Sequence, residues 1–284
     1  MLLKLIYNYF KVKKFFKKTQ KFTFKKNLIE LPITLIITSY NNKNYYQENL
    51  DSVLKQNYSN YNVIYIDDYS DDNTAQLVER HIDNFDILKK IKLIKNNIRK
   101  KKLANLYNVI HSLTNNRIII ELDGDDFLAH ANVLNAFNLK YQEGYKLVYA
   151  NYINNPIELA KKLKIGNFFQ ITPKLIVKNN MFREYPWVYS GLRSYCAGLF
   201  KQIKYEDLLY KKDNRFFPVC HDLAMFYPML EMAREKVSWI EEPLLIRNIN
   251  SSINDFKVYS EDIKQDIIKE IRNAPKYNKL CNLL

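Results

Sequence analysis

Three carboxylates follow a short apolar run near the middle of the chain. Residues 118–122 read Ile-Ile-Ile-Glu-Leu, and Asp123, Asp125 and Asp126 come directly after them. A β-branched run that stops at a glycine predicts a buried strand that delivers its last residues to a loop. Carboxylates this close repel one another and tend to take up protons unless a cation lies among them. Since Mg²⁺ binds few protein carboxylates and completes its shell with substrate phosphates, the group could hold a metal and, through it, a diphosphate.

The elements that would position these carboxylates can be read from the hydrophobic pattern. Short apolar runs predict four strands, at residues 33–38, 61–66, 91–94 and 117–122. Apolar residues at helical spacing predict helices between them, at 45–56, through Ala75 and Val78, and at 103–113. Ser70 or Asp71 is the expected N-cap of the middle helix. This alternation predicts right-handed βαβ units and a mostly parallel sheet, hence an α/β fold.

Polar clusters follow three of the predicted strands, at residues 38–41, 67–72 and 123–126. In parallel sheets, ligands bind at the carboxyl ends of the strands. The alternative for an isolated acidic motif is a solvated turn, because short motifs also occur by chance. The convergence of three clusters at one edge favours a binding site.

Composition sets the class of protein. The chain has 284 residues, of which 47% are hydrophobic and 14% aromatic, as expected for a globular protein with ample core. Its 3 cysteines have neither disulfide nor metal-site spacing, which suits a reducing compartment and predicts a cytoplasmic location.

The net charge of +14 is concentrated at the start of the chain, where residues 1–30 contain nine lysines and the single acidic residue Glu30. Leucine, isoleucine and phenylalanine interleave with these lysines, a pattern typical of an amphipathic helix on an anionic membrane surface. The segment is too short and too charged to span a bilayer, and no signal-cleavage site follows it. The alternative is a flexible or packed basic extension. We expect no nucleic-acid partner.

Three segments in order resemble the family 2 glycosyltransferases: ITLIITSYNN (33–42), DSVLKQNYSNYNVIYIDDYSDDNT (51–74) and IIIELDGDDFL (118–128). The resemblance implies a GT-A fold, which is a Rossmann-like, mostly parallel sheet flanked by helices. It also implies a nucleoside-diphosphate-sugar donor, with a UDP-sugar favoured, a divalent metal (Mn²⁺ or Mg²⁺) and an inverting displacement. We expect residues 31–284 to form one domain, with a donor half (31–150), an acceptor half (151–255) and a C-terminal helix (256–284).

The same resemblance assigns residues of the donor half by position. Thr38 and Tyr40 would line the nucleoside, and Asp68 would accept a hydrogen bond from the base. Asp123 would face the ribose, while Asp125, with Asp126 beside it, would serve the metal and the diphosphate.

One departure from the family pattern lies between the third strand and its helix. The family usually has a small Gly-Ala pair there, whereas residues 97–105 read NIRKKKLAN. Lys102 or Arg99 could reach the donor diphosphate, because a point cation suits phosphate oxygens. The alternative is a solvated charge run at the start of a helix.

The acceptor half contains two stretches, 189–203 and 216–233, that resemble one branch of the family. The first holds Leu192-Arg193-Ser194-Tyr195, and in the second Asp222 takes the place of the family's catalytic base. Apolar neighbours would raise the basicity of Asp222. An N-cap role for Asp222 is the alternative, and the roles of His221 and Arg193 stay open.

Residues 241–255 resemble the family's closing segment, which folds over the donor phosphates. Arg247 would contact the diphosphate, and Asn250 stands near the place of a metal-side histidine of some relatives. A strand is expected at 237–240 and a terminal helix, packed on the outside, around residues 262–271.

The sequence therefore predicts an inverting, metal-dependent glycosyltransferase whose base, Asp222, activates a hydroxyl of a glycan, lipid or protein acceptor. A nucleotidyltransferase is the rival enzyme, but residues 39–46 lack the Gly-rich phosphate loop it normally needs. A basic membrane- or nucleic-acid-binding protein on an inactive scaffold is the other alternative.

Overall fold

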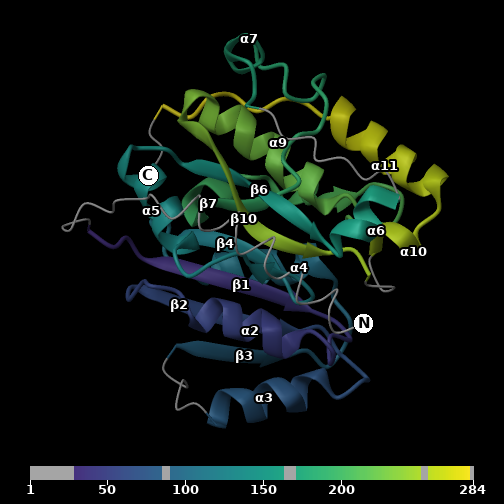
Figure 1. Ribbon diagram of the computed structural model, residues 1–284. Helices are drawn as coiled ribbons and strands as arrows, with labels where there is room; N and C mark the ends of the chain where they lie inside the picture. The colour runs from purple at the N-terminus through teal and green to yellow at the C-terminus, as the bar shows by residue number, and fades with distance from the viewer. Residues whose placement is uncertain (1–28, 85–89, 163–170, 251–254, 282–284) are drawn as a thin grey trace.

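The computed structural model describes residues 29–84, 90–162, 171–250 and 255–281. Almost all of the basic N-terminal segment expected from the sequence lies outside these residues. The described part forms an eight-stranded sheet in the order β3-β2-β1-β4-β7-β6-β10-β5, with helices packed against it (Figure 1). A mixed, mostly parallel sheet flanked by helices confirms the predicted α/β class.

The first half of the sheet is parallel throughout. It contains β1 (Ile33–Ser39), β2 (Tyr61–Asp67), β3 (Ile91–Lys95) and β4 (Ile118–Asp123). Helices α2 (Tyr46–Leu54), α3 (Thr74–Asn84) and α4 (Lys102–His111) connect these strands in turn. The apolar runs form these strands because both faces are covered: Leu35, Ile36 and Ile37 are all fully buried. The four strands predicted from sequence are thus confirmed to within one or two residues at their ends.

The expected N-cap of α3 was wrong. The helix begins at Thr74, and the Asp72 carboxylate accepts a hydrogen bond from the Thr74 amide at 3.0 Å. Ser70 instead accepts a hydrogen bond from the Asn41 amide at 2.9 Å, which joins the loop after β1 to the loop after β2. Both loops are therefore fixed at the carboxyl edge of the sheet.

The second half of the sheet is mixed. It contains β5 (Phe127–Leu128), β6 (Leu147–Asn155), β7 (Leu192–Cys196) and β10 (Val237–Asn248), and α5 (Val133–Gln142) precedes β6. Strand β7 runs antiparallel to both β4 and β6, whereas β10 is parallel to β6 and antiparallel to β5. Strand β10 extends well beyond the predicted 237–240, because its register with β6 shifts around Pro243 and accommodates the missing amide.

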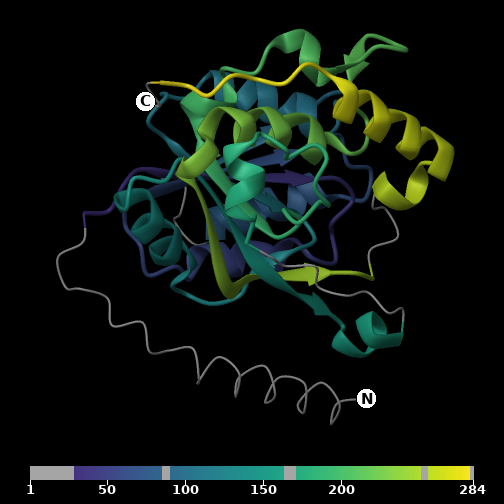
Figure 2. The same ribbon diagram turned by 90° about the horizontal axis from the view of Figure 1, so that it is seen from above.

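The remaining elements cover this half of the sheet. They are α6 (Ile157–Lys162), α7 (Lys174–Lys178), α8 (Ala197–Phe200), the hairpin strands β8 (Leu209–Tyr210) and β9 (Arg215–Phe216), α9 (His221–Ala233), α10 (Asp255–Val258) and α11 (Glu261–Asn273), with 3₁₀ turns at Tyr205–Leu208 and Arg234–Lys236. Helix α9 is buried from Leu223 to its end, and α11 packs beside it on the outside, as predicted (Figures 1 and 2).

A buried ion pair fixes the C-terminal segment to α9. The Glu231 carboxylate, which is fully buried, pairs with Arg183 through contacts of 2.5 and 2.9 Å. Arg183 also donates to the carbonyl oxygens of Ile271 and Ala274, at the end of α11. A search of the described residues finds no helix that is both long and apolar enough to cross a membrane.

Candidate active site

The loops after β1 and β4 meet at the carboxyl edge of the sheet. The Gly124 amide donates to the Thr38 carbonyl oxygen at 2.9 Å. A Cβ atom at residue 124 would lie 2.7 Å from the Cβ of Ser39 and 2.6 Å from the Asn42 amide nitrogen, closer than real Cβ contacts allow. Glycine at this position therefore lets the acidic loop lie directly against the loop after β1.

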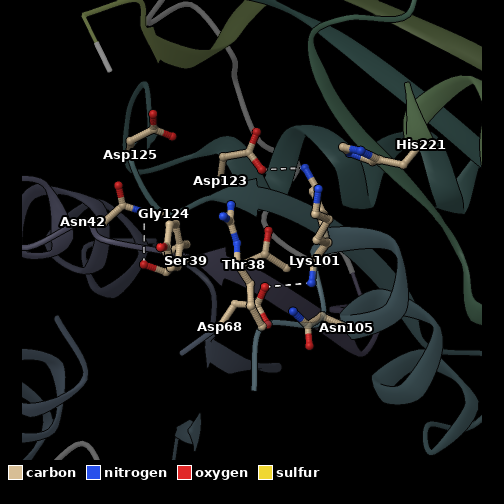
Figure 3. A pocket seen from close by; sticks show the side chains of 13 residues that line it. Thr38, Ser39, Asn42, Asp68, Lys101, Asn105, Asp123, Gly124, Asp125 and His221 are labelled. Carbon is tan, nitrogen blue, oxygen red and sulfur yellow. Dashed lines mark hydrogen bonds and ion pairs between the residues drawn. The ribbon is translucent and has the colours of Figure 1, made fainter. Parts of the chain in front are cut away.

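These strand ends enclose a first cavity of about 150 Å³, which we name the strand-end pocket (Figure 3). It brings together eight residues that the sequence singled out, and five others complete its lining. The first group is Thr38, Tyr40, Asp68, Arg99, Lys102, Asp123, Asp125 and His221; the second is Ser39, Asn42, Lys101, Asn105 and Gly124.

The Asp68 carboxylate is held by its surroundings at one end of this pocket. It accepts hydrogen bonds from the Asn96 side chain at 2.8 Å and from the Lys100 and Lys101 amides at 2.9 and 2.8 Å. Lys101 has a positive φ of 68°, and this left-handed conformation turns the two amides toward Asp68. A carboxylate offers about four acceptor positions. One position on Oδ2 is left for a further donor, such as an N–H of a base.

Tyr40 and Arg99 form a second wall of the strand-end pocket. The Arg99 guanidinium lies 3.8 Å from the centre of the Tyr40 ring, at cation–π distance. A planar ligand such as a nucleobase can stack on surfaces of this kind. Arg99 is thus engaged with Tyr40, and of the two cations that the sequence proposed for the diphosphate, Lys102 is the one that reaches Asp123.

Lys102 lies among carboxylates rather than in solvent. Its Nζ is 2.5 Å from Oδ1 of Asp123 and 3.7 Å from Oε2 of Glu121, and its side chain is only 12% exposed. Burial alone would lower the pKa of Lys102, but the charges of Asp123 and Glu121 outweigh it and raise this pKa. The same pairing outweighs burial at Asp123 and lowers the pKa of that carboxyl. The alternative prediction, that Lys102 belongs to a solvated charge run at the start of a helix, is therefore wrong.

Asp125 and Asp126 face two different cavities. Asp125 lines the strand-end pocket, whereas Asp126 is buried and faces the neighbouring cavity described below. Oδ1 of Asp126 accepts from the Asn248 amide at 2.7 Å, which fixes the acidic loop to β10. Burial, followed by the charges of Asp125 and Asp123, raises the pKa of Asp126 well above its usual range.

The part of this pKa shift that comes from the charges of Asp125 and Asp123 is one that a bound divalent cation would offset. The described residues contain no group of three or more His, Cys, Asp and Glu side chains arranged to hold a metal ion. This donor set suits a cation that binds one or both carboxylates, Asp125 and Asp126, and takes its other ligands from a diphosphate and water. The residues present therefore fit Mg²⁺ or Mn²⁺.

A second cavity, of about 420 Å³, lies under the N-terminus of α9, and we name it the α9 cavity. It shares Lys102, Asp123 and His221 with the strand-end pocket, so the two spaces adjoin across these side chains. Its other lining residues include four further residues that the sequence singled out, Asp126, Arg193, Asp222 and Arg247.

Asp222 lies in the first turn of α9, with its side chain 24% exposed to the α9 cavity. Cys220 occupies the N-cap position, so the alternative N-cap role of Asp222 was wrong. Nη1 of Arg193 lies 3.2 Å from Oδ2 of Asp222 and orients the carboxylate. Of the apolar neighbours expected from the sequence, Val219 and Leu223 line the cavity beside it.

Glu121 is a site residue that sequence reasoning missed. It is 4% exposed, lies on β4 opposite Arg193 on β7, and its Oε2 is 3.7 Å from Arg193 Nη2. Lys102 contacts the same oxygen of Glu121. Side chains of alternating charge therefore follow one another in the order Asp123, Lys102, Glu121, Arg193 and Asp222. A charged residue inside an otherwise apolar strand was the signal in the sequence.

His221 and Arg247 both line the α9 cavity. Burial, followed by the positive charge of Lys102, lowers the pKa of His221 to about 4, so its imidazole is neutral near pH 7. Arg247 lies outside the strand-end pocket, with its Nη1 3.4 Å from the Tyr152 hydroxyl and its guanidinium over that ring. Asn250 is exposed.

Comparison with known proteins supports the architecture and the family. One relative is UDP-Glc:alpha-D-GlcNAc-diphosphoundecaprenol beta-1,3-glucosyltransferase WfaP of Escherichia coli, which is 30% identical over 143 residues. That match covers 50% of this chain and 53% of the relative, so the chain spans about half the length of this protein.

Two solved structures share the fold at low sequence identity. Residues 1–349 of S. aureus TarS, in complex with UDP-GlcNAc, superpose with a TM-score of 0.56 at 14% identity, over 85% of this chain and 66% of that fragment. Glucosyl-3-phosphoglycerate synthase from Mycobacterium tuberculosis, in complex with Mn²⁺, UDP and phosphoglyceric acid, gives a TM-score of 0.55 at 12% identity, over 87% and 80% of the two chains. The predicted GT-A fold is confirmed by these likenesses.

The family assignment rests on a longer match. Residues 34–205, more than half of the chain, match the model of the family described as Glycosyl transferase family 2, and this segment contains the strand-end pocket residues from Thr38 to Asp125. The chain therefore belongs to glycosyl transferase family 2.

Proposed function

We propose that this protein is an inverting glycosyltransferase that moves a sugar from a UDP-sugar to a hydroxyl group of a sugar acceptor. The observation that carries the proposal is that the strand-end pocket and the α9 cavity adjoin, and we call the place where they meet the junction. A pocket with nucleotide-binding features adjoins, across Lys102, Asp123 and His221, a larger cavity that contains the candidate base Asp222. A donor and an acceptor bound on the two sides would meet at this junction.

In this proposal the nucleoside occupies the strand-end pocket. The open position on Asp68 accepts an N–H of the base, and Thr38 and Tyr40 line the nucleoside. Lys102 stays charged beside Asp123 and donates to the diphosphate, which offsets negative charge on the leaving group. Arg247, which lines the α9 cavity with Asp126, adds a second cation near the acidic loop.

Asp125 and Asp126 would hold a divalent metal, because adjacent carboxylates supply the oxygen ligands that hard cations prefer and a diphosphate completes the coordination shell. When bound, the metal supplies further electrostatic stabilisation of the departing diphosphate. Mn²⁺ in the structure of the M. tuberculosis synthase supports this assignment.

Asp222 acts on the acceptor side. The hydroxyl oxygen forms its bond to the anomeric carbon as the bond from that carbon to the diphosphate oxygen breaks, and the hydroxyl proton passes to the Asp222 carboxylate. Arg193 holds that carboxylate in place through the 3.2 Å contact. A single displacement of this kind inverts the anomeric configuration.

The acceptor class is inferred from the curated relative. WfaP is named for transfer from UDP-Glc to GlcNAc-diphosphoundecaprenol, so we propose a lipid-linked sugar as acceptor.

Residues 1–30 would then provide peripheral contact with an anionic membrane, since their lysines attract anionic lipids. Sedimentation with anionic vesicles should weaken with salt and be lost when residues 1–30 are deleted. Equal sedimentation of the truncated protein would refute this role.

One experiment tests the proposed activity. The purified protein is supplied with a panel of UDP-sugars and a GlcNAc-diphospho-alkyl acceptor, with Mn²⁺ or with a chelator, and the product anomer is read by NMR. We expect metal-dependent transfer with inversion, slowed roughly 10²–10⁴-fold in Asp222→Asn while UDP affinity is retained. Transfer by Asp222→Asn at the parent rate would remove Asp222 from the mechanism. Release of diphosphate from a nucleoside triphosphate and a sugar phosphate would instead support a nucleotidyltransferase.

A further inference from the structure

We propose that Arg272 binds an anionic phosphate of the acceptor, placed next to the reducing end of the acceptor sugar, and that the α9 cavity is therefore specific for diphosphate-linked sugars. This inference rests on the proposed function, because it assigns the acceptor to the α9 cavity. It adds a binding residue on α11, an element outside the segment that matches the family model.

The position of Arg272 is set by neutral partners. Its Nη1 donates to the carbonyl oxygen of Arg183 and lies 3.5 Å from that of Tyr185, and its guanidinium is 5.6 Å from the centre of the Tyr227 ring. Carbonyl groups and an aromatic face hold a guanidinium without cancelling its charge. An arginine has about five N–H donors, so the two contacts of Nη1 leave donors for a ligand in the cavity.

Among the described residues, two of the four cations that line the α9 cavity, Arg247 and Arg272, form no ion pair, and the charge of Arg247 acts on Asp126 of the acidic loop. Lys102 is paired with Asp123, and Arg193 is paired with Asp222 and approaches Glu121. Within the described part of the chain, Arg272 forms no ion pair with a carboxylate, although it lines the same cavity. An uncompensated guanidinium in a cavity is a favourable site for a phosphate, which it can bind with two parallel hydrogen bonds.

The α9 cavity also offers a surface for the acceptor sugar. Trp187 lines the same space, and its ring is supported edge-to-face by Tyr227 at 5.5 Å. An indole face presents an apolar platform for the C–H groups of a sugar ring. Asp222 for the hydroxyl, Trp187 for the ring and Arg272 for the phosphate thus define an acceptor with a hydroxyl and an anion on opposite parts of one sugar.

The site is preorganised by the buried ion pair described above. Arg183, paired with Glu231, donates at 2.6 Å to the carbonyl of Ile271, the residue before Arg272. Ile271 itself is buried against the core. A fixed helix end means that little conformational freedom is lost when the acceptor binds.

The test crosses enzyme variants with acceptors. Arg272→Gln keeps a donor for the carbonyl groups but removes the charge, and Lys269→Gln removes a charge from an exposed position of the same helix as a matched control. Each protein is assayed with a GlcNAc-diphospho-alkyl acceptor and with octyl α-GlcNAc, which carries no phosphate. We expect Arg272→Gln to raise KM for the diphosphate acceptor roughly 10- to 100-fold and leave KM for the neutral acceptor unchanged. Lys269→Gln should change neither.

An equal effect of Arg272→Gln on both acceptors, or no effect, overturns the inference, since a merely structural role does not depend on the acceptor's phosphate. Binding of the diphosphate acceptor in the presence of UDP, measured by calorimetry, gives a readout without transfer. The two proposals can also fail separately. If the parent protein binds the diphosphate acceptor but transfers no sugar, and Arg272→Gln loses that binding, the result supports the phosphate site and contradicts the proposed activity. Failure of the parent protein to bind the compound would contradict the site itself. If Arg272→Gln is too unstable to assay, Arg272→Lys replaces it as the test. Lysine keeps the charge but cannot form two parallel hydrogen bonds, so this variant should keep part of the affinity for the diphosphate acceptor.

Discussion

Replacement of Lys102 by methionine tests the donor site most directly, because this side chain is the cation that the structure places among the acidic residues of the strand-end pocket. Its Nζ lies 2.5 Å from Asp123 and 3.7 Å from Glu121. Methionine has a similar length and no charge. In Lys102→Met the diphosphate of UDP would lose a charged donor and meet the uncompensated carboxylate of Asp123, and both changes act in the same direction.

The size of the effect follows from the contacts. A hydrogen bond to a charged group contributes about 1.5–3 kcal/mol, so UDP should bind roughly 10- to 150-fold more weakly. Uridine, which has no phosphate, should bind as before. The loss of folding stability should be limited to about 1–3 kcal/mol, because Asp123 is 46% exposed and Glu121 keeps its approach to Arg193.

The assay is calorimetric titration of UDP and uridine into the parent protein, Lys102→Met and Lys100→Met. Lys100 is the matched control, since its side chain is exposed and its contact with Asp68 comes from the main-chain amide. Equal weakening of UDP and uridine in Lys102→Met would show a general disturbance of the pocket. An equal loss of UDP affinity in Lys100→Met would show that only net charge matters. Either result would refute the assignment of Lys102 to the diphosphate.

The remaining predictions concern the metal, a histidine and the ion pair under α11. Asp125→Asn should keep the fold but abolish the Mn²⁺-dependent part of UDP affinity in calorimetry, and an unchanged Mn²⁺ effect would place the metal elsewhere. The pKa of His221 is about 4 in the fold against 6.5 ordinarily, so the unfolded state takes up the proton first and stability falls as the pH drops through this window. Urea unfolding should show this loss between about pH 7 and about pH 5, and His221→Asn should flatten it. Glu231→Gln leaves the buried Arg183 charge unpaired and should cost about 3–5 kcal/mol in denaturant unfolding; a loss below about 1 kcal/mol would contradict this reading of the pair.

Much of the donor half could be predicted from local pattern. Apolar runs that stop at polar clusters gave the four parallel strands, and the carboxyl ends of parallel strands necessarily meet at one edge. This is why Thr38, Asp68 and Asp125, far apart in the chain, were expected together and do line one pocket. The glycine at the end of the fourth strand was read only as a strand end, and the structure adds that a Cβ atom at Gly124 would collide with the loop after β1.

The pairing of charges across the sheet was decided only by the tertiary structure. Periodicity tells which face of a strand a side chain occupies, but it does not identify the neighbouring strand. Glu121 and Arg193 become partners because β7 inserts antiparallel beside β4, an order that no local signal encodes. For the same reason, the sequence left the role of Arg193 open and missed Glu121.

For Lys102, the sequence supplied the residue type and the tertiary structure decided its environment. The sequence identified a lysine run at the start of a helix, and both a phosphate contact and a solvated surface were compatible with it. Packing of α4 against the sheet buries this one lysine beside Asp123, while Lys100, two residues earlier, stays exposed. Arg272 is a still longer-range case, since it reaches the α9 cavity only because the buried pair of Arg183 and Glu231 fixes the end of α11 there. The sequence alone thus determined the strands and the chemistry at their ends, whereas the tertiary structure decided which charges meet, because those contacts join segments with no local relation in the chain.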